Sequence, residues 1–140
     1  MRAFVLLAAF ISSPCLAQDQ IKLRCAGEQT SESAAGSEVR PYEKIYRIDL
    51  ADNRWCEDAC RAMHDIAEVH PVQITLEEKQ TDSPSEQTLT RNFINRETGR
   101  HSILSTARYF GPVSLTVMLK WEGHCEPEPF DEFPEVQTKF

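Results

Sequence analysis

The stretch from Ser114 to Cys125 has the clearest alternation of apolar and polar residues in the chain. One set of alternate positions is mostly apolar and consists of Leu115, Val117, Leu119, Trp121, Gly123 and Cys125. The positions between them are mainly polar or charged, as in a β-strand with one buried face. We therefore predict a strand here. Burial of its four large apolar side chains would contribute at most roughly 6–12 kcal/mol.

Five further segments carry shorter alternations or flank a turn, and we predict a strand in each: 21–25, 42–50, 72–76, 88–96 and 100–108. The last two are separated by Glu97-Thr98-Gly99, a hairpin spacing in which Gly99 would adopt a left-handed conformation. No amphipathic helix separates the strands, which disfavours a parallel sheet. The sequence predicts an all-β, single-domain antiparallel meander of about six strands, forming a curved sheet or a small up-and-down barrel.

Polar stretches without periodicity separate these strands. Residues 26–39 and 80–87 are small and polar, and we predict an exposed loop in each. Residues 55–63 are predicted to form a short helical turn or a tight loop. Residues 126–140 carry three prolines and five acids, which predicts a solvated, largely disordered tail.

The first residues have the features of a secretory signal peptide. A basic start is followed by the apolar run Ala3–Ile11, and small residues stand at Cys15 and Ala17 before Gln18. We predict cleavage after Ala17, because Pro14 disfavours the alternative of a lipoprotein signal at Cys15. The apolar run is shorter than the ~20 residues that span a bilayer, so we expect no integral membrane segment after cleavage.

Cleavage would leave a β-sheet domain over residues 18–125 and the acidic, proline-rich tail over residues 126–140. We expect this mature chain to be periplasmic or secreted. Its formal net charge before cleavage is −7, and its basic residues stand singly among acids. This pattern argues against nucleic acid as a partner and disfavours anionic membrane surfaces.

Four of the five cysteines follow the predicted cleavage site. An even number in an exported chain predicts two disulfides. We favour Cys25–Cys125 with Cys56–Cys60, because this arrangement joins the nearby pair locally and ties the first strand to the last. The two other connectivities stay open at this point.

Residues with catalytic or metal-binding chemistry do not form a recognisable constellation. No Gly-x-Ser-x-Gly elbow occurs, and the acids Glu57 and Asp58 would raise the thiol pKa of the Cys56–Cys60 pair. The four histidines, His64, His70, His101 and His124, show no metal-ligand spacing. We expect no catalytic residue, no cofactor and no metal site.

Two positions stand out as a ligand or partner surface. Arg96 with Asn95, beside the predicted hairpin turn, could bind an anionic ligand; the alternative is a solvated sheet face with cross-strand ion pairs. Trp121 lies on the apolar face of the predicted last strand, and we expect a pocket near it.

Short motifs support a resemblance across much of the mature chain: Tyr46-Arg47-Ile48-Asp49-Leu50, Trp55-Cys56, Cys60, Ile94 to Gly99 and Gly123-His124-Cys125. With these, the chain resembles small exported, disulfide-bonded β-sheet proteins of Gram-negative bacteria, most of them uncharacterised. The resemblance implies a periplasmic setting and supplies no catalytic residues.

Two classes of function follow from these observations. The first is a non-enzymatic exported binding module for a small apolar ligand or an envelope protein, with its site in a barrel mouth or open sheet. The second is a secreted inhibitor or protein–protein interaction factor that uses exposed loops such as 26–39.

Overall fold

The computed structural model describes residues 19–134. The predicted signal peptide, residues 1–17, lies outside this range, as do the last six residues of the predicted tail. The described chain forms one sheet of nine antiparallel strands. The strands are β1 (Gln20–Ser33), β2 (Gly36–Asp49), β3 (Arg54–Glu57), β4 (His64–Asp65), β5 (Glu68–Val69), β6 (Gln73–Asp82), β7 (Glu86–Asn95), β8 (Arg100–Tyr109) and β9 (Leu115–Glu128).

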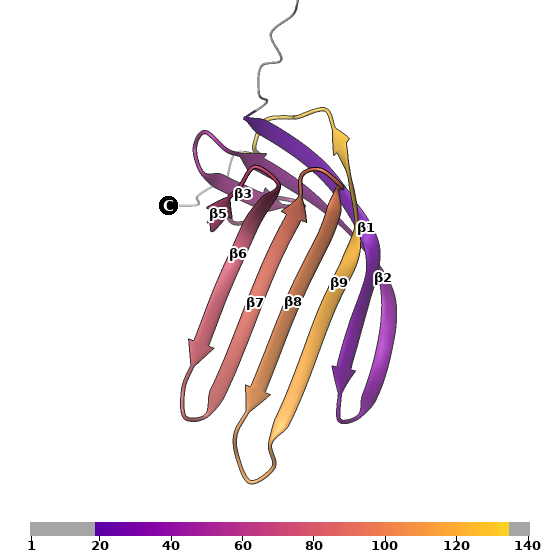
Figure 1. The fold of residues 1–140 in the computed structure, drawn as a ribbon, viewed down its shortest axis with the longest axis vertical. Coiled ribbons are helices and arrows are strands. Elements are labelled where there is room, and N and C mark those ends of the chain that lie inside the picture. The colour runs from indigo at the N-terminus through magenta and orange to yellow at the C-terminus, as the bar shows by residue number, and fades with distance from the viewer. Residues whose placement is uncertain (1–18, 135–140) are drawn as a thin grey trace, which may run out of the picture.

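The sheet is a meander whose first and last long strands pair with each other. Its order is β4-β3-β2-β1-β9-β8-β7-β6-β5, so every neighbour is also a sequence neighbour except at the β1–β9 pair. The sheet curls into a half-barrel, and its two ends are the short strands β4 and β5 (Figure 1). The predicted all-β, antiparallel class is confirmed. The prediction of about six strands is wrong, because β3, β4 and β5 have four, two and two residues, too few to show an alternation.

The predictions of exposed loops over 26–39 and 80–87 are also wrong. β1 and β2 pair from Gln20 with Asp49 to Ser33 with Gly36, so only Ala34 and Ala35 connect them. Likewise β6 continues to Asp82 and β7 begins at Glu86. These parts of the strands extend beyond the core, and both of their faces carry polar residues. Their backbones pair without the apolar alternation from which a strand is recognised.

The core lies in the half of the sheet that is uppermost in Figure 1, where the sheet curls over itself. Its buried members are Cys25, Tyr46, Ile48, Trp55, Ile66, Ile74, Leu76, Ile94 and Cys125. The connection between β4 and β5 spans the gap here: the Ile66 amide donates to the Asn53 carbonyl (3.1 Å), and the Ala67 amide donates to the Leu76 carbonyl (3.4 Å). The upper half is thereby closed around its core.

The lower half of the sheet is open on one side. On β2, only residues 46–49 pair with β3, and on β6 only residues 74 and 75 pair with β5. The long strands continue below this level and end in three hairpin turns, β1–β2, β6–β7 and β8–β9, at the lower end of the molecule (Figure 1).

The predicted strand over 114–125 is present as β9, and its apolar positions face the inside of the curl. Cys125 is buried in the closed half, whereas Trp121 and Leu119 are half-buried in the open half. β9 runs three residues beyond Cys125. The chain that follows lies against the sheet, where Asp131 accepts hydrogen bonds from Arg47 (2.8 Å) and Lys22 (3.0 Å).

Candidate functional site

Two glycines allow the central strands of the sheet to approach each other closely. Gly27 on β1 and Gly123 on β9 face each other directly. A side chain on Gly123 would overlap the carbonyl oxygen of Ala26, and one on Gly27 would overlap the carbonyl oxygen of Glu122. Glycine in a strand allows such a close approach of two backbones. The central β1–β9 pair can therefore bend sharply at this point.

The same glycines let the Tyr42 side chain reach across β1 and β9 on one face of the sheet. Tyr42 on β2 pairs with Gly27, and His101 on β8 pairs with Gly123, so two glycines separate them in one row. The Tyr42 hydroxyl donates to His101 Nδ1 over 2.8 Å. A Cβ atom on Gly123 would lie 2.5 Å from that hydroxyl. The glycine row is thus needed for the Tyr42–His101 contact as well as for the curl.

His101 belongs to a buried chain of hydrogen bonds. Asn92 Nδ2 donates to the Tyr46 hydroxyl oxygen (3.3 Å), which leaves Asn92 Oδ1 to accept from His101 Nε2 (3.1 Å). The neutral imidazole therefore carries its hydrogen on Nε2, and Nδ1 accepts from Tyr42. Burial lowers the pKa of His101 to about 4, with a smaller effect from the nearby positive charge of Lys44. Burial also raises the pKa of Tyr42 to about 12, so the hydroxyl keeps the proton that it donates.

We expect the free energy of unfolding to fall as the pH is lowered from 6.5 to about 4. His101 titrates near 4 in the folded protein and near its ordinary value of about 6.5 when unfolded, so the unfolded chain binds more protons in this window. The stability is fully present above about 6.5 and is lost as the pH falls through the folded value, by about 3 kcal/mol in total. Urea unfolding at several pH values measures this slope.

His101→Gln is the control for that measurement, because glutamine does not titrate. The slope between pH 6.5 and 4 should flatten in the variant, whatever its absolute stability. The carboxyl groups of Glu122, Glu128 and Asp131 have a pKa below the ordinary range, because hydrogen bonds from Lys and Arg side chains stabilise their charged forms. Protonation of these carboxyl groups therefore lowers the free energy of unfolding at a lower pH than protonation of His101 does. An unchanged slope in His101→Gln would contradict the assignment.

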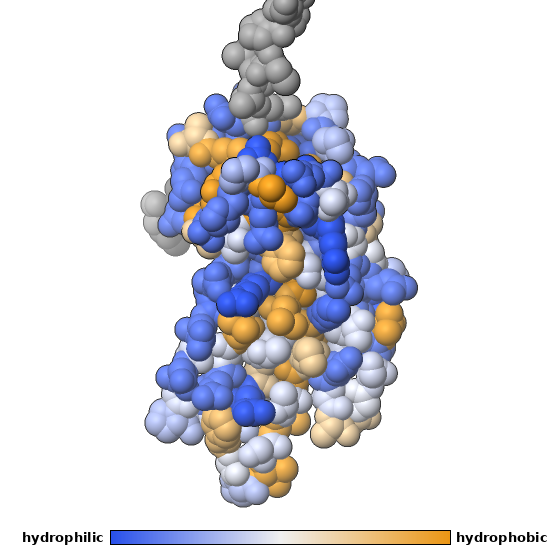
Figure 2. Space-filling view, viewed as in Figure 1, coloured by the Kyte–Doolittle hydropathy of each residue, from blue (hydrophilic) through white to orange (hydrophobic). Residues whose placement is uncertain are grey.

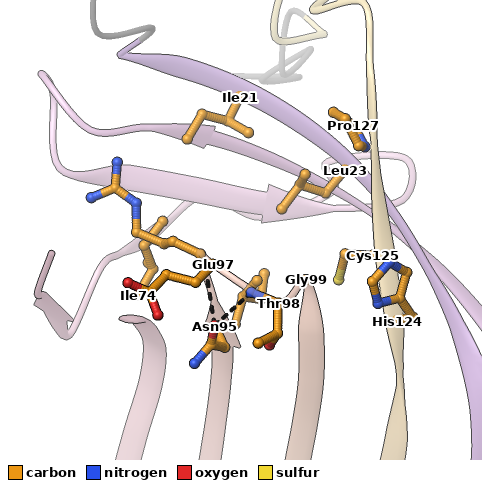
Figure 3. Close-up of a pocket in the computed structure, with 12 residues that line it drawn as sticks. Ile21, Leu23, Ile74, Asn95, Glu97, Thr98, Gly99, His124, Cys125 and Pro127 are labelled. Atoms are coloured by element: carbon orange, nitrogen blue, oxygen red, sulfur yellow. Dashed lines mark hydrogen bonds between the residues drawn. The ribbon is translucent and has the colours of Figure 1, made fainter. Parts of the chain in front are cut away.

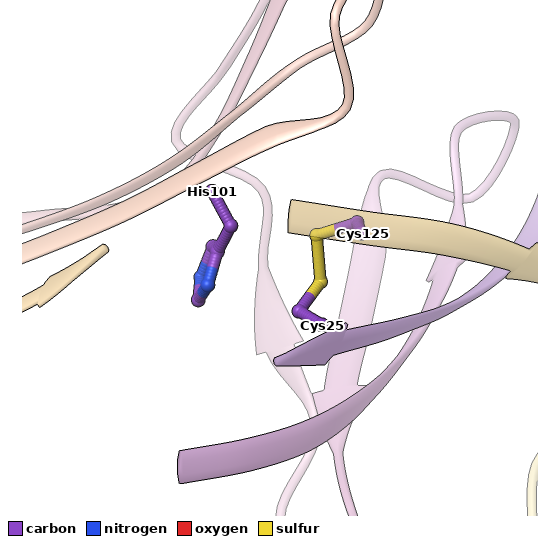
Figure 4. Close-up of side chains that lie close together, drawn as sticks. All are labelled: Cys25, His101 and Cys125. Carbon is purple, nitrogen blue, oxygen red and sulfur yellow. A yellow bond between two sulfur atoms is a disulfide. The ribbon is translucent and has the colours of Figure 1, made fainter. Parts of the chain in front are cut away.

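The Cys25–Cys125 disulfide lies two residues along the strands from the glycine pair and joins β1 to β9 at directly paired positions. The second bridge is Cys56–Cys60, which fixes the turn after β3. The predicted connectivity is confirmed. Cys25, Cys125 and His101 lie close together (Figure 4), with their ligand atoms within 4.8 Å of one another. Because the two sulfurs are bonded to each other and both ring nitrogens are hydrogen-bonded, this cluster is structural in the oxidised protein.

A cavity of about 380 Å³ opens at the upper end of the curled sheet, between β1 and the β7–β8 turn (Figure 3). We call it the end cavity. Its floor and walls are apolar: Ile21, Leu23, Ile74, Ile94, Cys125 and Pro127. Its rim is polar: Asn95, Arg96, Glu97, Thr98, Gly99 and His124. Figure 2 shows apolar surface at this end of the molecule with polar residues around it.

The rim is built on a firmly held turn. Asn95 Oδ1 accepts hydrogen bonds from the amides of Glu97 (3.0 Å) and Thr98 (2.8 Å), drawn in Figure 3. Gly99 has a φ of 70°, and its amide donates to the Asn95 carbonyl over 2.9 Å. The predicted hairpin with a left-handed Gly99 is confirmed. The carbonyl of Gly99 then accepts from the Cys125 amide (2.8 Å), which fixes the turn to the disulfide.

Arg96 supplies a positive charge at the rim. Its backbone amide donates to the Val72 carbonyl (2.7 Å), and its guanidinium donates to the His70 carbonyl over 3.4 Å. Within residues 19–134 the guanidinium forms no ion pair with a carboxylate. Most other arginines of the sheet are neutralised by acids, for example Arg91 by Glu78 (2.8 Å). An anionic group entering the cavity would therefore find Arg96 available.

The structure separates the residues that the sequence grouped as a possible surface. Asn95 and Arg96 lie together at the rim of the end cavity. Trp121 lies further down β9, opposite Gln29 and Ile103 in the open half, and does not line the end cavity. The floor residues Ile21 and Leu23 were recognised only as one face of a strand. Their alternation with Cys25 was the available signal.

Comparison of the chain with protein-family models, with curated proteins and with solved structures finds no match. Two disulfides fit a compartment outside the reducing cytoplasm. Among residues 19–134, no helix is long and apolar enough to cross a membrane.

Proposed function

We propose that the protein is an exported, non-enzymatic binding module that takes a small apolar ligand, or an apolar group of an envelope component, into the end cavity. The observation that supports this most directly is the cavity itself. Its floor is continuous with the buried core through Ile74, Ile94 and Cys125, and its rim is polar. A concave apolar site with a few polar groups at its mouth is the usual form of a small-molecule site.

The dimensions and charges of the cavity limit the class of ligand. Its volume of about 380 Å³ is near the lower end of ligand sites, which favours one short acyl chain or one aromatic group. Arg96 would attract a carboxylate or another anionic group at the end of that ligand. The apolar part would displace water from Leu23, Ile94 and Pro127. We therefore infer a small amphipathic acid as the preferred chemistry.

The rim does not assemble the groups that acyl transfer or hydrolysis needs. Those reactions need a nucleophile hydrogen-bonded to a base. The Thr98 hydroxyl instead accepts from the Arg100 amide over 3.3 Å. His101, which belongs to a buried hydrogen-bond network, is held by Tyr42 and Asn92 beneath the cavity. These contacts support a binding role.

Octanoate is a suitable probe, because it combines a short acyl chain with a carboxylate. Titration of the oxidised, ¹⁵N-labelled protein should shift the backbone amide signals of residues 94–99 and 123–125. The amides of the three lower hairpin turns should stay in place, since they lie at the other end of the sheet. Absence of saturable shifts around the end cavity would contradict the proposal.

Arg96→Gln should weaken octanoate binding roughly 2–5-fold, the effect of losing one exposed charge interaction. 1-Octanol has the same chain length without the charge, so its affinity should not change. Arg91→Gln is the matched control, because Arg91 is exposed on the outer face and paired with Glu78. Equal effects of the two variants on octanoate would show that Arg96 has no specific role.

The alternative function, a secreted inhibitor or interaction factor, rests on the disulfide-stapled frame and on exposed loops such as residues 26–39. That stretch is part of the β1–β2 hairpin. One way for an interaction factor to bind a partner would be strand addition at the lower edges of β2 and β6. Both edges carry features that oppose strand addition, Pro41 on β2 and the charged residues Glu78 and Lys79 on β6. The end cavity therefore supports the binding module better.

A further inference from the structure

One turn concentrates the exposed apolar side chains. Among residues 19–134, eight large apolar side chains are exposed, and four of these lie in or beside the β8–β9 turn: Tyr109, Phe110, Val113 and Leu115. Val113 is 84% exposed, more than any of the others. No charged residue occurs from Tyr109 to Leu119, although 26% of the chain is charged. We call residues 109–115 the β8–β9 tip.

The β8–β9 tip projects from the lower end of the molecule (Figure 1). The end cavity, beside the β7–β8 turn, lies at the other end of the sheet. Figure 2 shows apolar atoms on this lowest turn. The tip is held against the β6–β7 turn by a hydrogen bond from the Phe110 amide to the Ser85 carbonyl (2.9 Å). The two neighbouring turns, Ala34-Ala35 and Ser83-Pro84-Ser85, are also uncharged. The three turns themselves thus carry small or apolar groups, and charged residues such as Asp82, Glu86 and Arg108 begin on the adjoining strands.

We propose that the β8–β9 tip inserts into the interfacial layer of a lipid bilayer with a zwitterionic surface. The tip is a narrow convex projection, which suits a deformable layer better than a rigid groove of matching shape. Tyrosine and phenylalanine are favourable at the boundary between headgroups and acyl chains. The net charge of −7 gives no attraction to anionic lipids, so the apolar side chains would provide the affinity.

This attachment goes beyond the proposed ligand-binding function and does not depend on it. The tip and the end cavity lie at opposite ends of β8, with Tyr109 at one end and Gly99 just before the other. A protein held by the tip would direct the mouth of the end cavity away from the lipid surface. Its ligand would then be exchanged with the aqueous phase or with a partner there.

Flotation with phosphatidylcholine–phosphatidylethanolamine vesicles tests the proposal on the oxidised exported chain. The wild type should float with these vesicles, and added salt should not release it, because the attachment is apolar. Val113→Asp should lower the vesicle-bound fraction at least about tenfold, since it places a charge where the wild type would insert an apolar side chain into the lipid. Val113 is almost fully exposed in the free protein, so the variant should fold normally.

Val72→Asp is the matched control, because Val72 is 42% exposed at the opposite end, just before β6. It should float like the wild type. Three outcomes would overturn the proposal: no flotation with vesicles of any composition, equal flotation of Val113→Asp and the wild type, or flotation only with phosphatidylglycerol vesicles that salt abolishes. The first would leave a pocket on another protein as the site for the tip, and the last would show an electrostatic attachment.

Discussion

Replacing both Cys25 and Cys125 with alanine should lower the free energy of unfolding by roughly 2–5 kcal/mol. The bridge spans 100 residues of sequence, and a closed loop of that length restricts the unfolded chain by up to about 4.7 kcal/mol on the chain-entropy model. It also joins β1 to β9 at the centre of the sheet. Urea unfolding of the oxidised wild type and the double variant measures the difference.

The second bridge provides the comparison for that experiment. Cys56 and Cys60 are separated by only four positions, so their replacement by alanine should cost less, about 2 kcal/mol on the same model. The order of the two effects matters more than either value. A larger loss from the short bridge would show that the β1–β9 pairing is not what holds the curled sheet together.

Gly123→Ala should destabilise the protein by about 3 kcal/mol or prevent it from folding. The added Cβ would overlap the Ala26 carbonyl and lie 2.5 Å from the Tyr42 hydroxyl. Overpacking typically costs 1–3 kcal/mol, and here the obstacle is a paired backbone that cannot rotate away as a side chain would. Thermal unfolding followed by circular dichroism gives the effect. The Tyr42–His101 hydrogen bond should be lost with it.

Gly111→Ala is the matched control for Gly123→Ala. Gly111 lies in the β8–β9 turn, has no left-handed φ, and its Cβ would find its nearest neighbour at 3.9 Å. Alanine should therefore change the stability by less than about 0.5 kcal/mol. Equal tolerance of alanine at both positions would contradict the close approach of β1 and β9 on which the curl depends.

The sequence was sufficient where one face of a strand is buried or a turn needs a special conformation. The apolar alternation that includes Trp121 and Cys125 correctly predicted the inward face of β9. The position of Gly99 correctly predicted the β7–β8 turn. The even number of cysteines and their spacing predicted the two bridges. The polar halves of β1 and β2 were missed, because backbone pairing with solvent on both faces leaves no pattern of side chains.

The candidate site was only partly predictable, because it depends on contacts between distant strands. Asn95 and Arg96 were selected for their charge and their place beside a turn, and both lie at the rim of the end cavity. Its floor combines Leu23 with Ile94, which are far apart in sequence. Trp121 was expected beside a pocket because its face is apolar, yet the sheet does not close at its level. His101 was considered only as a metal ligand, since the glycines that let Tyr42 reach it lie on two other strands.

Native mass spectrometry of the oxidised protein purified from its own host tests the ligand-binding proposal most directly. We predict a non-covalent adduct of a small amphipathic acid that disappears on denaturation. The adduct should be much reduced in Leu23→Glu. The new carboxylate would lie in the apolar part of the end cavity and would repel the acidic ligand. A bare mass lighter by the four hydrogens of two disulfides, with no adduct in either protein, would contradict the account.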